Sequence, residues 1–170
     1  MASPADRASL DRLVSAHLSE ALRLAIRLTG DPDEAEEVVQ EALLRVARSW
    51  KSFRGEAQFR TWLFRIVINA FRDGIAACKP TEPLDADVPD RRVADPSSEA
   101  ATAELGRLVA ARVSALPPRQ REVVILTCYE GLSTQEAAEV LGISRANVHA
   151  TLHVARRRLR RELARHFAEP

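Results

Sequence analysis

Apolar positions recur along this chain at the three-and-four-residue spacing of amphipathic helices, and no useful stretch alternates as a strand would. Residues 6–28 form the first such segment, and Gly30 ends it. Asp31 and Pro32 then supply a cap and a first-turn proline for a second helix. The apolar stripe of that helix consists of Val39, Ala42, Leu43, Val46 and Trp50. A third helix is expected over about residues 57–77, and the pattern predicts an all-α fold.

Residues 79–98 interrupt this pattern, because they hold four prolines, five acidic residues and few large apolar groups. Such a segment buries too little surface to offset chain entropy, so we expect a flexible linker. It divides the chain into two small helical domains, residues 1–78 and 99–170. The second domain opens with a helix from about Ser98 to Ser114. The next helix starts at the following proline pair and ends at Gly131.

The segment after Gly131 has the pattern of a helix-turn-helix. Ser133 and Glu136 form a capping-box pair for a short helix, Gly142 supplies a tight turn, and Ser144 caps a longer second helix. The alternative is an ordinary helical hairpin whose glycine merely ends a helix. A generic hairpin does not need this capping, this spacing and a basic continuation together, so the pattern favours DNA binding.

The two faces of this motif differ in character. Small or apolar residues, among them Ala137, Ala138 and Val148, stand where the helices must cross. Polar side chains on the early, outward part of the second helix are expected to reach base edges, and later arginines to meet phosphates. The predicted contacts are Ser133, Thr134, Arg145, Asn147, His149, Thr151, Arg156 and Arg157.

Charge supports this interpretation. The composition, 46% apolar and 29% charged, is that of a globular protein, and the net charge is only +1. Residues 145–167, however, carry seven arginines against the single Glu162. Positive charge is therefore concentrated on the last helix, where a phosphate backbone would attract it.

The third helix carries aromatic and apolar residues on one face and a separate polar stripe of Arg65, Asn69 and Arg72. Aromatics beside arginines suit unstacked single-stranded bases. Taken alone, an aromatic stripe at helical spacing is more typical of a core. The acidic start of the second helix, residues 33–37, also has two interpretations. Carboxylates in a first turn are favoured by the helix dipole, and the alternative is a partner-binding face.

Other chemistry has little support in the sequence. His149 and His153 have a metal-ligand spacing, but Ala150 stands where a metalloprotease has glutamate. Cys78 and Cys128 are expected to be separate thiols. No phosphate-binding loop or nucleophile motif occurs, so we expect no enzyme, metal or cofactor. No apolar run is long enough to span a membrane, and the first residues do not form a signal peptide, so a cytoplasmic protein is expected.

Taken together, these segments resemble the extracytoplasmic-function group of bacterial sigma factors. The resemblance covers nearly the whole chain, in order, and is carried by several independent blocks. These are residues 33–41, 53–55, 59–66 with Asn69, 116–122, the helix-turn-helix and 152–159.

The resemblance implies a non-enzymatic promoter-specificity subunit whose partners are core RNA polymerase and promoter DNA. The first domain would bind polymerase and the downstream promoter element, and the second would read the upstream element. The implied polymerase contacts are Glu34, Glu37, Gln40, Glu41 and Leu44. The implied downstream-element contacts are Arg60, Trp62, Arg65, Asn69 and Arg72. Relatives are often held by an anti-sigma factor, a partner that no residue here identifies.

Two departures from the family pattern predict weaker or altered promoter recognition. Relatives often have a basic run after the third helix, where this chain has residues 74–78 without a cation. They also often have cations early in the recognition helix, where this chain has His149, Ala150 and Thr151, and Val154 replaces a common arginine.

Two other functions stay open at this point. A free-standing dimeric helix-turn-helix regulator would need a palindromic site and no polymerase. A metal-dependent enzyme built on His149 and His153 would lose activity on chelation.

Overall fold

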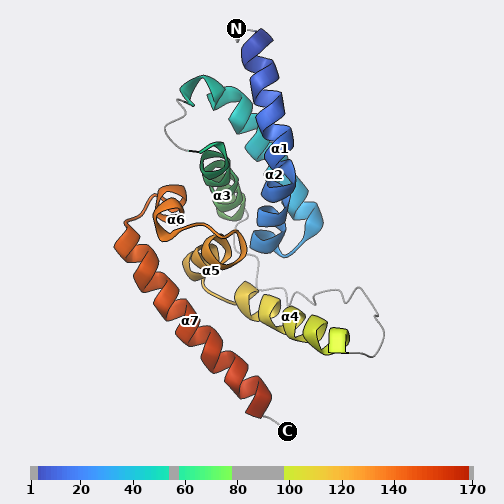
Figure 1. The fold of residues 1–170 in the computed structure, drawn as a ribbon, viewed down its shortest axis with the longest axis vertical. Helices are drawn as coiled ribbons and strands as arrows, with labels where there is room; N and C mark the ends of the chain where they lie inside the picture. The colour runs from blue at the N-terminus through green and yellow to red at the C-terminus, as the bar shows by residue number, and fades with distance from the viewer. Residues whose placement is uncertain (1–3, 54–57, 78–97, 169–170) are drawn as a thin grey trace.

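The structure, a computed structural model, describes residues 4–53, 58–77 and 98–168, and every regular element in them is helical (Figure 1). The predicted all-α fold is confirmed. The first group consists of α1 (Pro4–Thr29), α2 (Pro32–Ser49), the short 3-10 turn η1 (Trp50–Ser52) and α3 (Phe59–Ala77). The predicted linker, apart from Ser98, lies outside the described residues.

The second group contains the predicted helix-turn-helix. It consists of α4 (Ser98–Ser114), α5 (Pro118–Val124), the π-helical turn η2 (Ile125–Tyr129), α6 (Thr134–Leu141) and α7 (Arg145–Ala168). The sequence predicted one helix up to Gly131, but the helix widens into η2 after Val124. The Thr127 hydroxyl donates to the Val123 carbonyl at 2.7 Å, the oxygen that a continuing α-helix would offer to a backbone N–H. The Thr127 hydroxyl thus competes with the backbone for this carbonyl at the point where the helix widens.

The turn between α1 and α2 follows from local chemistry. Gly30 has φ +82°, which glycine adopts without steric cost. The Asp31 carboxylate accepts hydrogen bonds from the backbone N–H groups of Asp33 and Glu34 at 2.8 and 3.0 Å. These N–H groups have no partner within the helix, so the cap stabilises the start of α2 by about 1 kcal/mol.

The core of the first group lies where α1, α2 and α3 meet. Leu24 and Leu28 from α1, Val46 from α2, and Leu63 and Phe64 from α3 are all essentially without solvent exposure. Burial of each such side chain contributes about 1.5–3 kcal/mol relative to exposure. The predicted stripe on α2 is confirmed, because Val39, Ala42 and Val46 are buried while Leu43 and Trp50 are half-buried.

The second group packs against the first rather than standing apart from it. Val123, Leu126 and Val148 are fully buried, and they belong to the same cluster of buried residues as Phe64. Helix α3 lies between α6 on one side and α1 and α2 on the other (Figure 1). The fold therefore brings α3 and the helix-turn-helix into direct contact.

Candidate nucleic-acid interface

The helix-turn-helix is built by three local devices that the sequence predicted. The Ser133 hydroxyl accepts from the Glu136 N–H at 3.2 Å, and the Glu136 carboxylate accepts from the Ser133 N–H at 2.8 Å. Hydrogen bonds from the Ser133 side chain and backbone lower the pKa of Glu136. Gly142 adopts φ +65°, and the Ser144 hydroxyl accepts from the Asn147 N–H at 3.2 Å. These bonds fix the end of α6 and the start of α7.

The inner face of the motif is apolar, as expected. Ala137 and Ala138 on α6 are buried, and Val148 on α7 has no exposed surface. Small side chains at the crossing let α6 and α7 approach closely, while Ile143 fills the angle half-buried. The outward face of α7 is thereby held in a fixed orientation.

The outward face exposes most of the residues predicted to contact DNA. Ser133, Arg145, Asn147, His149, Arg156 and Arg157 are exposed, while Thr134 and Thr151 are half-buried. Helix α7 extends well past α5 toward the C-terminus (Figure 1), so its later arginines lie beyond the compact part of the motif. A long basic helix with an exposed polar start has the geometry of a major-groove reader with flanking phosphate contacts.

Helix α3 presents the second set of predicted DNA contacts. Arg65 and Asn69 are exposed, and Arg60, Trp62 and Arg72 are half-buried. Trp62 lies against Phe53 and Phe59, with ring centroids 5.0 and 5.7 Å apart. The aromatic stripe is therefore mainly packed, and the arginines are the polar part of this helix.

The arginines of α3 bind the second group of helices, a set of contacts that sequence reasoning missed. Arg72 donates to both carboxylate oxygens of Glu122 at 2.8 and 2.7 Å, and this hydrogen-bonded pair raises the pKa of Arg72. Arg65 donates twice to the Glu139 carbonyl, at 3.0 and 2.6 Å. No sequence signal pairs residues 50 and 74 positions apart, so these contacts could not have been found before the fold.

A further cluster connects α1, α3 and the end of η2. Arg60 donates to Glu20 at 2.7 Å and to the Glu130 carbonyl at 2.7 Å, and Arg27 forms an ion pair with the Glu130 carboxylate. Burial raises the pKa of Glu20, but hydrogen bonds from Arg60 and His17 outweigh it and leave that pKa lowered. The cluster holds Glu130, whose side chain is only 3% exposed.

The acidic face of α2 is oriented away from the core. Ala35, Val39, Ala42 and Val46 are buried, so the opposite side of the helix faces solvent. Of the residues predicted there, Glu34, Glu37, Gln40 and Leu44 are exposed, and Glu41 is half-buried with its carboxylate accepting from Arg45 at 2.7 Å. Leu44 is 53% exposed, so the solvent side of α2 combines acidic and amide side chains with one apolar side chain.

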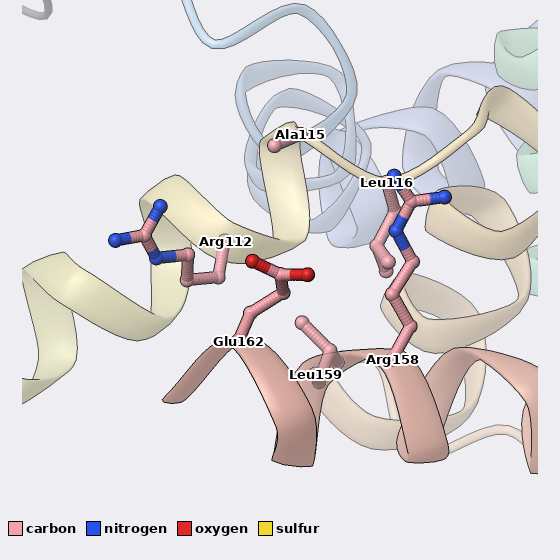
Figure 2. A pocket seen from close by; sticks show the side chains of 6 residues that line it. All are labelled: Arg112, Ala115, Leu116, Arg158, Leu159 and Glu162. Atoms are coloured by element: carbon pink, nitrogen blue, oxygen red, sulfur yellow. The ribbon is translucent and has the colours of Figure 1, made fainter. Parts of the chain in front are cut away.

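One hollow in the described part of the chain, of about 110 Å³, lies between α4 and α7. Figure 2 shows its lining, in which the Glu162 carboxylate lies near Leu159 while the guanidinium groups of Arg112 and Arg158 point away from it. Ligand pockets are usually about 300–1,000 Å³, so this hollow is small for a cofactor. No group of three histidine, cysteine or acidic side chains gathers as a metal site in the part of the chain that is described, and His149 and His153 are both exposed.

None of the described helices is both long enough and apolar enough to cross a membrane.

Two family models match the chain: Sigma-70 region 2 over residues 13–79, and Sigma-70, region 4 over residues 106–159. The chain is 35% identical to the ECF RNA polymerase sigma factor SigE of Mycolicibacterium smegmatis, over 95% of this chain and 64% of that protein. It is 31% identical to the ECF RNA polymerase sigma factor SigW of Bacillus subtilis, over 93% of this chain and 90% of that protein.

Solved structures agree with this similarity. CnrH, in its complex with the cytosolic domain of CnrY, matches with a TM-score of 0.67 and 32% identity, over 96% of this chain and 91% of CnrH. The sigma factor RpoE of Bartonella quintana, bound to the anti-sigma factor NepR, matches with a TM-score of 0.69, over 92% of this chain and 97% of RpoE. Its identity is 21%, so it supports the fold alone.

Proposed function

The chain belongs to the extracytoplasmic-function group of bacterial RNA polymerase sigma factors, and from that premise we propose that it binds core RNA polymerase and directs transcription initiation by recognising and melting promoter DNA. The observation that carries the proposal is the exposed, basic recognition helix α7 of a capped helix-turn-helix, within the segment matched to Sigma-70, region 4. The protein would act without catalysing a reaction, in the cytoplasm, where bacterial polymerase works.

The first domain, residues 1–78, is proposed to dock on polymerase through the exposed face of α2. That face presents Glu34, Glu37, Gln40 and Glu41 around the exposed Leu44. An exposed leucine supplies apolar area, and the surrounding carboxylates select a basic partner surface and speed association.

The second domain, residues 99–170, is proposed to read the upstream element with α7, while residues 79–98 connect the two domains along the polymerase. Arg145, Asn147 and His149 would face base edges, and Arg156 and Arg157 the phosphates. A lysine at position 149 would add a cation near the bases, so promoter-binding titrations with His149→Lys should show higher affinity on at least one preferred site.

The downstream element is proposed to be held on α3. Arg60, Arg65, Asn69 and Arg72 would attract the backbone of unpaired DNA, with Trp62 beside them. CnrH, which is 32% identical to this chain, is solved with a second protein, the cytosolic domain of CnrY, and this supports the proposal that an anti-sigma factor is a further partner.

Co-elution with purified bacterial core RNA polymerase on a sizing column tests the proposal. Leu44→Arg should abolish co-elution, because it places a charge in the centre of the proposed surface. Leu105→Arg is the matched control: Leu105 on α4 is 46% exposed against 53% for Leu44. Gln40→Ala and Glu41→Arg should weaken binding at the edge of the same surface.

The outcomes separate the possible functions. Co-elution of the wild type and of Leu105→Arg, but not of Leu44→Arg, would support a sigma factor that docks through α2. Absence of wild-type co-elution, with selection of a palindromic DNA fragment by the protein alone, would contradict the proposal and leave the free-standing dimeric regulator, which no comparison favours.

A further inference from the structure

Four arginines of the first helical group donate to oxygen atoms of the second group. Arg27 pairs with the Glu130 carboxylate, and Arg60 donates to the Glu130 carbonyl at 2.7 Å. Arg65 donates to the Glu139 carbonyl, and Arg72 to the Glu122 carboxylate. We call these four contacts the arginine latch. In the opposite direction Arg121 donates to the Leu28 carbonyl at 3.1 Å.

Three members of the arginine latch are the same side chains proposed to hold downstream DNA: Arg60, Arg65 and Arg72. Each directs its guanidinium toward the second group. Arg72 uses Nε and one terminal nitrogen on the two oxygens of Glu122, the fork geometry that also binds phosphate. One fork cannot hold a carboxylate and a phosphate at once, so the second domain and DNA exclude one another at Arg72.

Two of the three acceptor residues have buried side chains. The side chains of Glu122 and Glu130 are each only 3% exposed, although carboxylates are rarely buried without a partner. Glu122 also has Arg119 of its own helix at 3.5 Å, and Glu130 has Arg60 at 3.7 Å besides Arg27. Withdrawal of Arg72 or Arg27 while the domains stayed together would therefore weaken the pairing of a buried carboxylate, which is costly. The arginines therefore leave their carboxylates when the domains separate and water reaches both partners.

The proposed polymerase surface stays open in this arrangement. Leu44 on α2 is 53% exposed, and the contacts of the arginine latch come from α1 and α3. Figure 1 shows α3 between α6 and the α1–α2 pair, and in the described part of the chain the second group contacts α3 through α6 and α1 through η2.

We propose that the arginine latch keeps the unbound protein closed and occupies the DNA-binding arginines of α3, so that single-stranded DNA and the second domain compete for the same side chains. Polymerase docking on α2 then precedes domain separation. This inference rests on the proposed function for the identity of the DNA site, while the closed state itself does not depend on it.

Two readouts on the full chain test the arginine latch without polymerase: the radius of gyration from small-angle X-ray scattering, and anisotropy of a fluorescent single-stranded DNA pool of random sequence. Glu122→Gln and Glu130→Gln keep side-chain size and remove one charge each from the interface. Glu104→Gln is the control, because it removes one charge from an exposed side chain of α4 in the same domain. All four proteins are compared at one salt concentration, since DNA affinity depends strongly on salt.

Glu122→Gln and Glu130→Gln should each increase the radius of gyration and bind the DNA pool about threefold to tenfold more tightly than Glu104→Gln, because a larger fraction of molecules is open. Adding Arg65→Ala to Glu122→Gln should remove part of that gain. Circular dichroism checks that each variant keeps its helices, and the two glutamate sites serve as independent tests.

Equal radii and equal DNA affinity for all three single variants would overturn the proposal. So would a larger radius without tighter DNA binding, because the competition would then be absent. Absence of wild-type co-elution with polymerase, by contrast, would contradict the proposed function. The closed state would then still be tested by the scattering data alone.

Discussion

Replacement of Gly142 by alanine should destabilise the protein, although the added methyl group has ample space. A Cβ at this position would meet no heavy atom within 4 Å, so steric overlap contributes nothing. The cost comes from the backbone, because φ +65° is a conformation that costs an L-residue about 1–2 kcal/mol. Alanine also restricts the unfolded chain, which returns about 0.4–1 kcal/mol. The net expectation is a loss of about 1 kcal/mol.

Gly106→Ala provides the matched control with the opposite sign. Gly106 lies inside α4, has no positive φ, and its added Cβ also meets nothing within 4 Å. In a helix interior alanine is favoured over glycine by about 1 kcal/mol, so this variant should be more stable than the wild type. Both sites belong to the second helical group, so the two variants report on the same part of the fold.

Urea denaturation followed by circular dichroism measures both effects. The two alanine variants should differ by about 2 kcal/mol, which corresponds to a midpoint separation of about 1 M at a usual urea dependence. Gly142→Asn should lie between Gly142→Ala and the wild type, because asparagine tolerates the left-handed conformation better. Equal stability of Gly142→Ala and the wild type, or a shift of both alanine variants in one direction, would refute the backbone explanation.

Three further predictions concern the cap, a surface ion pair and metal. Ser133→Ala should cost about 1 kcal/mol at pH 7 in urea denaturation. The Ser133 hydroxyl also donates to the Glu136 carboxylate, and hydrogen bonding to Ser133 lowers the pKa of Glu136 from 4.5. This part of the stabilisation is present above pH 4.5 and is lost as the pH falls through the lowered value, so the difference between the variant and the wild type should shrink in acid. Asp73→Asn breaks a 2.5 Å ion pair with Arg45 but should change stability by less than about 1 kcal/mol in thermal melts, because the Asp73 side chain is 64% exposed. Excess EDTA should leave the melting temperature unchanged, and a drop would restore a metal role for His149 and His153.

Local chemistry explains which parts of this fold were predictable from the sequence. The Asp31 cap, the Ser133–Glu136 capping box and the Gly142 turn each depend on residues within a few positions of one another, and all three have the expected geometry. Helical periodicity likewise predicted the buried stripe of α2, because it needs only the direction of the helix face.

Long-range contacts were not predictable in the same way. The pairing of Arg72 with Glu122 depends on how α3 lies on the second group, which no spacing within either segment specifies. The sequence therefore showed Arg65 and Arg72 in the polar stripe of α3 but not their acceptors. The widened turn η2 was missed for a related reason, since its residues continue the apolar pattern of α5 without a break.

If Arg72 contacts downstream DNA as proposed, its pairing with Glu122 couples promoter preference to the closed state of the unbound protein. A substitution at position 72 that altered the preferred downstream sequence would also remove the fork that grips Glu122. Promoter preference and the fraction of unbound protein in the closed state would then change together, unless position 122 changed as well. In related chains we therefore expect positions 72 and 122 to vary as a pair. A change in the preferred promoter sequence would then be accompanied by a change in how readily the closed state opens.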